Sequence, residues 1–175
     1  MPTLHLNDQN LKYTIIMKVD KSSRHSKITG NFAEGLILYW LSKYGFECAL
    51  VDHVGVDIIA RNPATQELMG ISVKSRSRST GKEGQYVHIP NDHFEKIEEA
   101  CRAFACVPYL AIVVDKGSDI HGFITSMSHF LLLFPRRETA AGWKMNRTWL
   151  DHYKNDSEIK YFRFRHETIN WWKKM

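Results

Sequence analysis

Two apolar segments joined by a turn constrain the fold of this 175-residue chain more than any other feature. The first segment is GVDIIAR (residues 55–61), NPAT forms the turn, and QELMGISVKSR (66–76) is the second segment. Apolar segments of this length, separated by Asn and Pro, are typical of a β-hairpin. Only two charged side chains interrupt the apolar parts of these strands, Asp57 in the first and Lys74 near the end of the second.

The register of this hairpin predicts which side chains share a face. A turn centred between Pro63 and Ala64 places Asp57 opposite Gly70. Because side chains alternate along a strand, Asp57, Gly70, Ser72 and Lys74 are expected on one face, with open space at the glycine. The opposite face is expected to enter a core through its apolar side chains: Val56, Ile58, Ile71 and Val73.

The segments around the hairpin predict an α/β fold with the element order αβββαβ. A helix is expected from Asn31 to Tyr44, with Gly45 ending it, and a strand over residues 46–53. Three consecutive strands favour an antiparallel meander. A second helix over residues 92–105, capped by Asn91 or Asp92, then leads to a buried strand at 107–115 that lies parallel to a neighbour.

The chain divides into three parts on this interpretation. Residues 1–28 are expected to form an N-terminal arm with one strand-like stretch, YTIIMKV, and residues 29–126 the core with its mixed central sheet flanked by helices. The segment SRSRSTGKEGQ (75–85) is expected to be a mobile basic loop, and IHGFITS (120–126) a further strand. Residues 127–175 are expected to form an aromatic and basic extension packed on the core.

Glu34 is unusual because its helix is apolar around almost its whole circumference. The apolar residues of this helix are Phe32, Leu36, Ile37, Leu38, Trp40, Leu41 and Tyr44. A carboxylate among them needs a cation, a metal ion or hydrogen-bond donors. A salt bridge, or exposure in the first helical turn, explains Glu34 as well as a functional role does.

The combination of these features is more specific than any one of them. GNFAEGL with Glu34, GVDIIAR with Asp57 and ISVKSRS with Lys74, in the order αβββαβ, resemble the PD-(D/E)XK nuclease superfamily. Within it, the arrangement resembles the Holliday-junction-resolvase-like and restriction-endonuclease-like branches, over residues 29–126. The resemblance implies Mg²⁺ (or Mn²⁺) held by Asp57, Glu34 and the backbone carbonyl of Val73. It also implies DNA as the partner and Lys74 as the catalytic ammonium.

Ser72 departs from the motif of this superfamily, which has an acid or sometimes Gln at the position two before the lysine. A hydroxyl is a weak and neutral ligand, so the site has one negative charge fewer. Either Glu34 or a bound water fills the gap and the enzyme works, or the fold is kept and catalysis is lost. Glu67 cannot replace the missing acid, because the predicted register places it on the other face.

Charge and composition are consistent with a DNA partner without requiring one. The net charge of +5 and the pI of about 9.1 allow a polyanionic ligand. Arg76, Arg78 and Lys82 are predicted phosphate contacts, although a solvated basic loop explains them equally well. The aromatic residues after Gly142 suit base stacking, but a packed subdomain or dimer contact is favoured.

Three cysteines in irregular spacing predict free thiols in a reducing compartment. The sequence shows neither a signal peptide nor an apolar segment long enough to span a bilayer, so the expected location is the cytoplasm, away from membranes. The leading hypothesis is therefore a metal-dependent DNA endonuclease or junction-resolving phosphodiesterase. A homodimer is expected, because two DNA strands must be cut. The alternatives are a catalytically silent nuclease-fold module that binds DNA or protein, and a structural domain whose acids form salt bridges.

Overall fold

The computed structural model describes residues 21–78, 81–82 and 84–169. The predicted strand YTIIMKV and the last two tryptophans, Trp171 and Trp172, lie outside the described residues. The described helices are α1 (His25–Lys43), α2 (Asn91–Ala103), α3 (Met127–Leu133) and α4 (Arg147–Asn155). The described strands are β1 (Glu47–His53), β2 (Val56–Arg61), β3 (Leu68–Arg78), β4 (Val87–Pro90), β5 (Val107–Lys116), β6 (Asp119–Ser126), β7 (Ala140–Trp143) and β8 (Lys160–Arg165).

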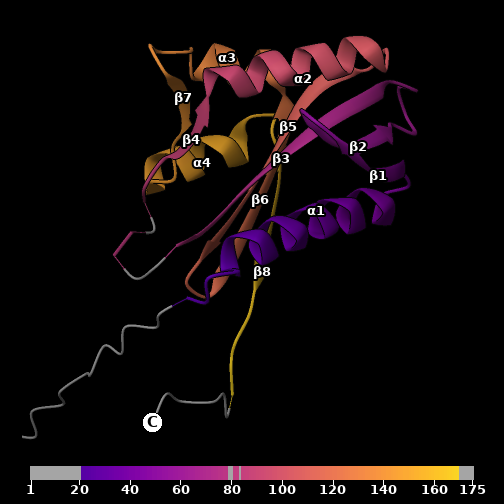
Figure 1. The fold of residues 1–175 in the computed structure, drawn as a ribbon. Helices are drawn as coiled ribbons and strands as arrows, with labels where there is room; N and C mark the ends of the chain where they lie inside the picture. The colour runs from indigo at the N-terminus through magenta and orange to yellow at the C-terminus, as the bar shows by residue number, and fades with distance from the viewer. Residues whose placement is uncertain (1–20, 79–80, 83, 170–175) are drawn as a thin grey trace, which may run out of the picture.

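The strands form a six-stranded mixed sheet and a separate two-stranded ribbon (Figure 1). The order in the large sheet is β1-β2-β3-β5-β6-β8, and β4 pairs with β7 in the ribbon. β3 and β5 are parallel, whereas the other neighbouring strands are antiparallel. The predicted α/β class, the antiparallel meander and the parallel strand after the second helix are confirmed.

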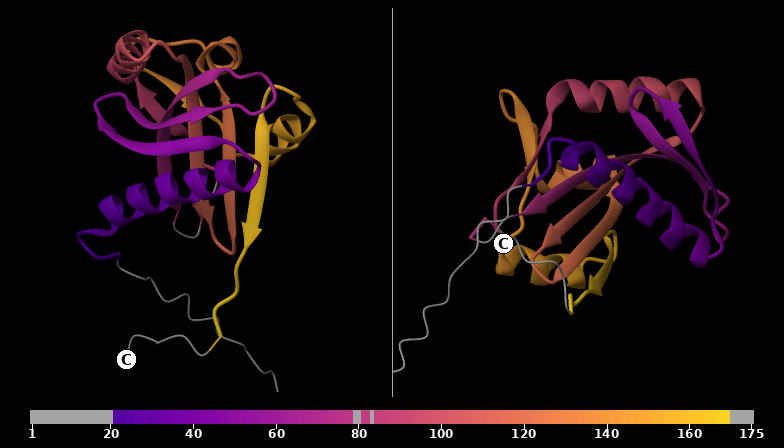
Figure 2. Two further views of the ribbon diagram at one scale, coloured as in Figure 1. Left: turned by 90° about the vertical axis from the view of Figure 1, so that its right-hand side faces the viewer. Right: turned by 60° about the horizontal axis from the view of Figure 1, so that its bottom comes forward.

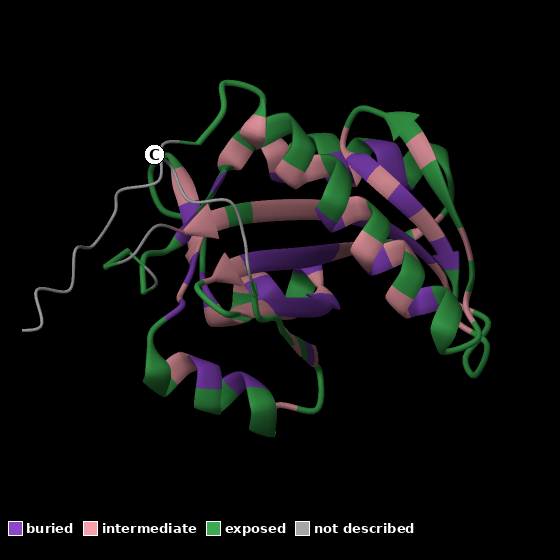
Figure 3. Ribbon diagram, turned by 90° about the horizontal axis from the view of Figure 1, so that it is seen from below, coloured by how far each residue is buried: buried purple, intermediate pink, exposed green. Residues whose placement is uncertain are grey.

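Helices cover both faces of the large sheet, with α1 on one face and α2 and α3 on the other (Figures 1 and 2). α1 contributes Ala33, Ile37 and Leu41 to a buried cluster with β2, β3 and β5. On the other face, Phe94 of α2 and Phe130 of α3 meet with their ring centroids 5.8 Å apart. Figure 3 shows that burial is greatest in the central strands, while the helices expose their outer sides.

The C-terminal part completes this architecture rather than standing apart from it. β8 forms the edge of the sheet beside β6, and the Phe162 ring lies over Gly122, where an added Cβ would overlap the ring carbons. Trp143 and Tyr153 are fully buried and stack with centroids 4.1 Å apart. These three aromatic side chains therefore serve packing, in agreement with the favoured interpretation. No helix among the described residues is long and apolar enough to cross a membrane.

Four local predictions were wrong. α1 begins at His25 rather than Asn31, so the polar segment before Asn31 is partly helical. Its outer side is not buried, since Phe32 is 49% exposed and Tyr44 60%. The cap of α2 is Pro90 without a side-chain bond, and the Asn91 amide instead donates to the carbonyls of residues 137 and 138. The predicted basic loop is shorter, because β3 continues to Arg78.

Candidate functional site

The candidate site lies where β2 and β3 separate. The two strands pair from Arg61–Leu68 to Ile58–Ile71 and no further. Beyond this point the Asp57 carboxylate takes the place of a partner strand. Its Oδ2 atom accepts the backbone N–H of Val73 at 2.6 Å and the hydroxyl of Ser72 at 3.3 Å. A side-chain carboxylate therefore satisfies a backbone donor that the separating strand leaves behind.

The observed register corrects the predicted one. Gly70 pairs with Ile59, so Asp57 lies beside Ser72 and not opposite the glycine. The shift is an even number of residues, which leaves the predicted face of Asp57 unchanged. There is no open space at Gly70, because a Cβ there would lie 2.5 Å from the sulfur of Cys106 and 2.6 Å from that of Cys101.

The separation of the strands also changes the environment of one predicted core residue. Val56 packs in the cluster on the α2 face, whereas Ile58 packs in the cluster on the α1 face. Residues two apart in a regular strand point to the same side. β2 therefore turns at Asp57, which lies between the two cores. The predicted shared face of Val56 with Ile58 was wrong for this reason.

Gly55 holds the turn before β2 against α2. Its φ of +98° is a conformation that favours glycine. A Cβ at this position would overlap the carbonyl oxygen of Lys96 and lie 2.6 Å from its carbonyl carbon. The backbone of the β1–β2 turn thus touches the backbone of α2. This contact brings Asp57 and the first turns of α2 to one place.

Ser72 connects the lysine to the aspartate. It is 1% exposed, and its hydroxyl accepts a hydrogen bond from Lys74 Nζ at 2.8 Å while donating to Asp57. Burial lowers the pKa of Lys74; the charge of Asp57 acts in the opposite direction and that of Arg76 in the same direction. The serine therefore holds an ammonium group that burial already disfavours beside a carboxylate.

Glu34 approaches the same group of charges from α1. Partial burial raises the pKa of Glu34, the negative charge of Asp57 raises it further, and the positive charge of Lys74 lowers it. Glu34 is thus linked to both residues by this electrostatic influence, although the two acids come from different elements. Hydrogen bonds join Asp57, Ser72 and Lys74 where β2 and β3 separate, a position that we call the fork.

A hollow of about 230 Å³ opens in front of Asp57, Ser72 and Lys74. Its other lining residues include two with ionisable side chains that the sequence interpretation missed, His93 and Lys96 of α2. Burial lowers the pKa of His93, and the charge of Lys74 lowers it further. The spacing of these two residues, three apart in the first turns of an amphipathic helix, was the signal available in the sequence.

None of the predicted phosphate contacts lines this hollow. Arg76 and Arg78 belong to β3, which corrects their assignment to a mobile loop, and Lys82 is exposed beyond the strand. The Arg78 guanidinium donates to the carbonyl oxygens of Tyr86 at 2.7 Å and Gln85 at 3.1 Å. Burial lowers the pKa of Arg78, and so does the charge of Arg76. Arg78 therefore braces the following segment.

The donor atoms at the fork fit a hard cation only in part. Across residues 21–78, 81–82 and 84–169, no three His, Cys, Asp or Glu side chains are grouped as a metal site. Mg²⁺, however, often binds one or two carboxylates and completes its shell with water and substrate phosphate. Asp57 is the only carboxylate among the described residues that line the hollow. The Asp57 and Ser72 side chains offer oxygen donors and no sulfur, so they suit Mg²⁺ or Mn²⁺ better than softer metals.

Comparison with known proteins supports the fold. The structure is similar to that of Hjc, a Holliday junction resolvase from the archaeal hyperthermophile Archaeoglobus fulgidus, with a TM-score of 0.52 and 19% sequence identity. The match covers 70% of this chain and 88% of the resolvase chain. No protein-family model matches the sequence, and no curated protein matches it. At this identity the similarity shows a shared fold and leaves function to be argued from the site.

Proposed function

We propose that this chain is a divalent-metal-dependent DNA endonuclease or junction-resolving phosphodiesterase of the PD-(D/E)XK type. The observation that carries the proposal is the hydrogen-bonded group of Asp57, Ser72 and Lys74 at the separation of β2 and β3, beside an open hollow. The similarity to a Holliday junction resolvase is consistent with DNA as the substrate. A structural domain would have less reason to keep the partly buried charges of Asp57 and Lys74 beside an open hollow, since partial burial of a charge costs free energy.

The proposed ligands are Asp57, Glu34 and the carbonyl oxygen of Val73. The N–H of Val73 points toward Asp57, and a strand residue directs its N–H and C=O to the same side. The carbonyl is therefore expected beside the carboxylate that takes the place of β2. When bound there, a divalent cation polarises the scissile phosphate and lowers the pKa of a coordinated water.

Lys74 and Ser72 have separate roles in this proposal. The Lys74 ammonium stabilises the negative charge that develops on the phosphate, or orients the attacking hydroxide. The Ser72 hydroxyl, 2.8 Å from Lys74 Nζ, keeps that ammonium in place. Ser72 does not add the missing charge, so the cation is expected to bind weakly until a DNA phosphate completes its shell.

The same serine supports a second candidate function, a catalytically silent nuclease-fold module that binds DNA or protein. Its hydroxyl accepts a hydrogen bond from Lys74 and donates one to Asp57, so its partners lie within the protein. On this alternative the three residues form a buried polar network that stabilises the fork. The two functions differ in their response to an added acid at position 72.

Calorimetric Mn²⁺ titration and a plasmid-nicking assay separate these functions. Asp57→Asn is expected to abolish both Mn²⁺ binding and nicking. Ser72→Glu is expected to tighten Mn²⁺ binding and to raise or create nicking, because it restores a carboxylate next to the hollow. It is also expected to lower stability without metal, because it adds a third negative charge.

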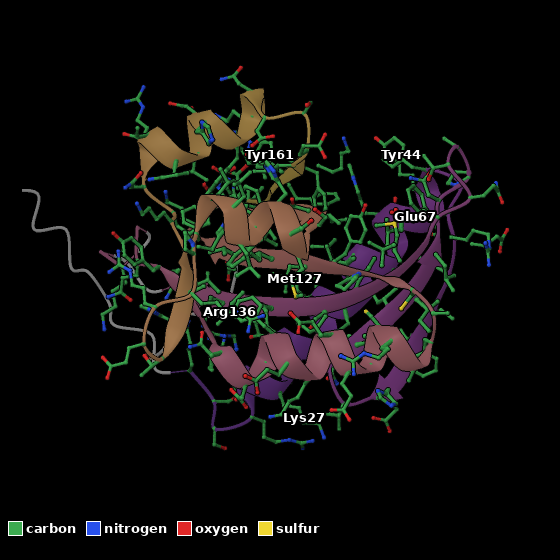
Figure 4. The ribbon with its side chains drawn as sticks, turned by 90° about the horizontal axis from the view of Figure 1, so that it is seen from above. Lys27, Tyr44, Glu67, Met127, Arg136 and Tyr161 are labelled. Carbon is green, nitrogen blue, oxygen red and sulfur yellow. The ribbon has the colours of Figure 1, made fainter. Side chains whose placement is uncertain are left out.

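Glu67→Gln is the matched control for loss of a carboxylate. Glu67 accepts the Tyr109 hydroxyl at 2.8 Å, and Figure 4 shows it near Tyr44, at the far end of the sheet from the β4–β7 ribbon. The Glu67→Gln variant should keep the Mn²⁺ affinity and the nicking activity of the parent protein. If Ser72→Glu binds Mn²⁺ no better than the parent, Ser72 does not occupy a ligand position and the nuclease-site assignment fails.

DNA contact by the basic end of β3 is tested by salt dependence. Arg76 and Lys82 are exposed, whereas Arg78 is engaged with backbone, so Arg76→Ala with Lys82→Ala is the informative variant. Each DNA phosphate that the variant no longer neutralises should reduce the log–log salt slope by about 0.9 for duplex DNA. The control is Arg102→Ala, which removes one positive charge in the last turn of α2. An unchanged slope in the double variant would exclude this surface.

Assembly and location follow from the same proposal. Because two strands of DNA must be cut, a homodimer is expected on the substrate, and sedimentation of the protein with and without DNA measures it. The cytoplasm is the inferred location, since Cys48, Cys101 and Cys106 are free thiols that suit a reducing compartment.

A further inference from the structure

The segment before and within β4 exposes two aromatic rings beside the arginines of β3. Val87 and Ile89 are fully buried, whereas Tyr86 is 45% exposed and His88 is also exposed. The strand thus directs alternate side chains into the core and outward. The two outward rings lie with centroids 6.0 Å apart and an interplanar angle of 54°.

β3 fixes the position of these rings. Besides the bond from Arg78 to the carbonyl of Tyr86, Arg76 Nη2 lies 3.5 Å from the carbonyl oxygen of His88. Arg78 therefore holds the backbone from which the Tyr86 ring projects, and Arg76 lies beside the backbone of His88. Lys74, Arg76 and Arg78 lie on the same side of β3 at intervals of about 6.6 Å. A row of positive charges consequently leads from the hollow at Asp57, Ser72 and Lys74 to the aromatic pair.

Two hollows meet at Tyr86 and His88. One, of about 510 Å³, is lined by Arg76 and Arg78, and the other, of about 200 Å³, by Arg137 and Lys144. Both are lined by Tyr86 and His88 as well. None of the described residues that line either hollow is acidic. The pair of rings is thus flanked by cations on both sides.

Gly142 keeps the second hollow open. It pairs with His88 across the β4–β7 ribbon, where a side chain would occupy the space beside the rings. A Cβ at this position would lie 3.7 Å from Tyr86 and 4.0 Å from His88, which is ordinary contact. A larger residue can therefore fill the hollow without a clash at its Cβ. This gives a way to block the surface while every ring and charge remains.

We propose that the surface formed by Tyr86, His88 and Gly142 stacks an unpaired base of a DNA strand whose phosphates follow Arg76 toward Lys74. Exposed aromatic rings in a cationic groove are the features that bind single-stranded nucleic acid. A continuous duplex hides the faces of its bases, so it cannot use these rings. The substrate class is therefore DNA with a single-stranded segment next to the cleavage position. The inference rests on the proposed function in taking DNA as the ligand.

The test measures binding in an Asp57→Asn background, so that no cleavage occurs. Fluorescence anisotropy compares the binding of two DNA ligands, a DNA fork with one single-stranded arm and a duplex of equal length. Tyr86→Ala is expected to weaken fork binding by roughly five- to one-hundred-fold, as loss of one stacked base does, and duplex binding less than two-fold. Tyr86→Phe should retain fork binding. The control is Tyr39→Ala, because Tyr39 is 55% exposed on α1.

Gly142→Val gives an independent result, since it fills the hollow and removes no ring or charge. It is expected to weaken fork binding and to reduce photocrosslinking of a 5-iodouracil base in the single-stranded arm. The inference is overturned if Tyr86→Ala and Gly142→Val both bind the fork as tightly as the parent. The proposed function fails separately, if the chain with Asp57 intact cuts no DNA while fork binding still depends on Tyr86.

Discussion

At the scale of single residues, partial burial raises the pKa of Glu34, and the negative charge of Asp57 raises it further. The raised pKa of Glu34 means that the folded protein releases this proton at a higher pH than the unfolded chain does. Its contribution to stability is therefore present below pH 4.5, the ordinary pKa of a glutamate, and is lost as the pH rises through the folded pKa. At neutral pH the Glu34 carboxylate destabilises the fold.

Glu34→Gln is accordingly expected to make the metal-free protein more stable at pH 7, by less than about 1 kcal/mol because water screens a partly exposed group. The gain should disappear below pH 4.5, where Glu34 is protonated in both states. Urea unfolding at several pH values measures the effect, with Glu95→Gln on the exposed surface of α2 as the control. A gain that does not change with pH would contradict this assignment.

The sequence predicted the shared face of Asp57, Ser72 and Lys74 correctly, but not the pairing of the two strands. Asp57, Ser72 and Lys74 share a face for any even shift of register, so an error in the hairpin turn did not matter. The turn was misplaced because Gln66 adopts a φ of +62°, which a glutamine does not signal. Gly70 was misjudged for another reason, since the sulfurs that fill its space come from α2 and the chain just after it.

At the scale of elements, Gly55 sets the distance between the β1–β2 turn and α2. Gly55→Ala is expected to destabilise the protein by at least about 2 kcal/mol, because strain at positive φ adds to overlap with the backbone of Lys96. This corresponds to a melting temperature lower by roughly 4–8 °C. The clash is with helix backbone, which cannot rotate away as a side chain can.

Gly81→Ala separates the two contributions. Gly81 also has a positive φ, of +82°, but nothing lies within 4 Å of its added Cβ. Thermal unfolding should therefore show a smaller loss for Gly81→Ala than for Gly55→Ala. Equal losses would mean that the contact between this turn and α2 contributes little. The sequence could not predict the contact of Gly55 with α2, because a β-turn by itself accounts for a glycine at that position.

At the scale of the whole molecule, the C-terminal residues supply both sheet and core. β8 pairs with β6 from Asp119–Arg165 to Ile124–Lys160, and Phe123 contacts Trp143 and Tyr153. A chain ending at Ser126 is therefore expected to remain unfolded, although the motif residues all lie before that point. Circular dichroism and solubility, compared with the full chain, test this. A folded fragment would show that residues 127–175 form a dispensable extension.

The fold class was predictable because the central strands are apolar and the turns between them contain Gly, Pro or Asn. The last third was not, because its strands are short and its aromatic residues suit several environments. Tyr161 illustrates this: its hydroxyl lies 3.0 Å from the buried His121 ring, a pairing between residues 40 positions apart. Such pairings depend on the order of strands in the sheet, which local patterns do not specify.

The hydrogen bond from the Val73 N–H to Asp57 means that exchange of this one amide hydrogen can measure occupancy of the site. A backbone amide in a continuous sheet exchanges with solvent when its neighbouring strand opens, whereas this amide exchanges when a carboxylate moves. A cation that fixes Asp57 should therefore slow hydrogen–deuterium exchange at Val73 more than at Ile71, which lies in the regular ladder. Mg²⁺ titration followed by exchange NMR would record occupancy at the fork without any DNA being cut. Equal slowing at both amides would contradict this.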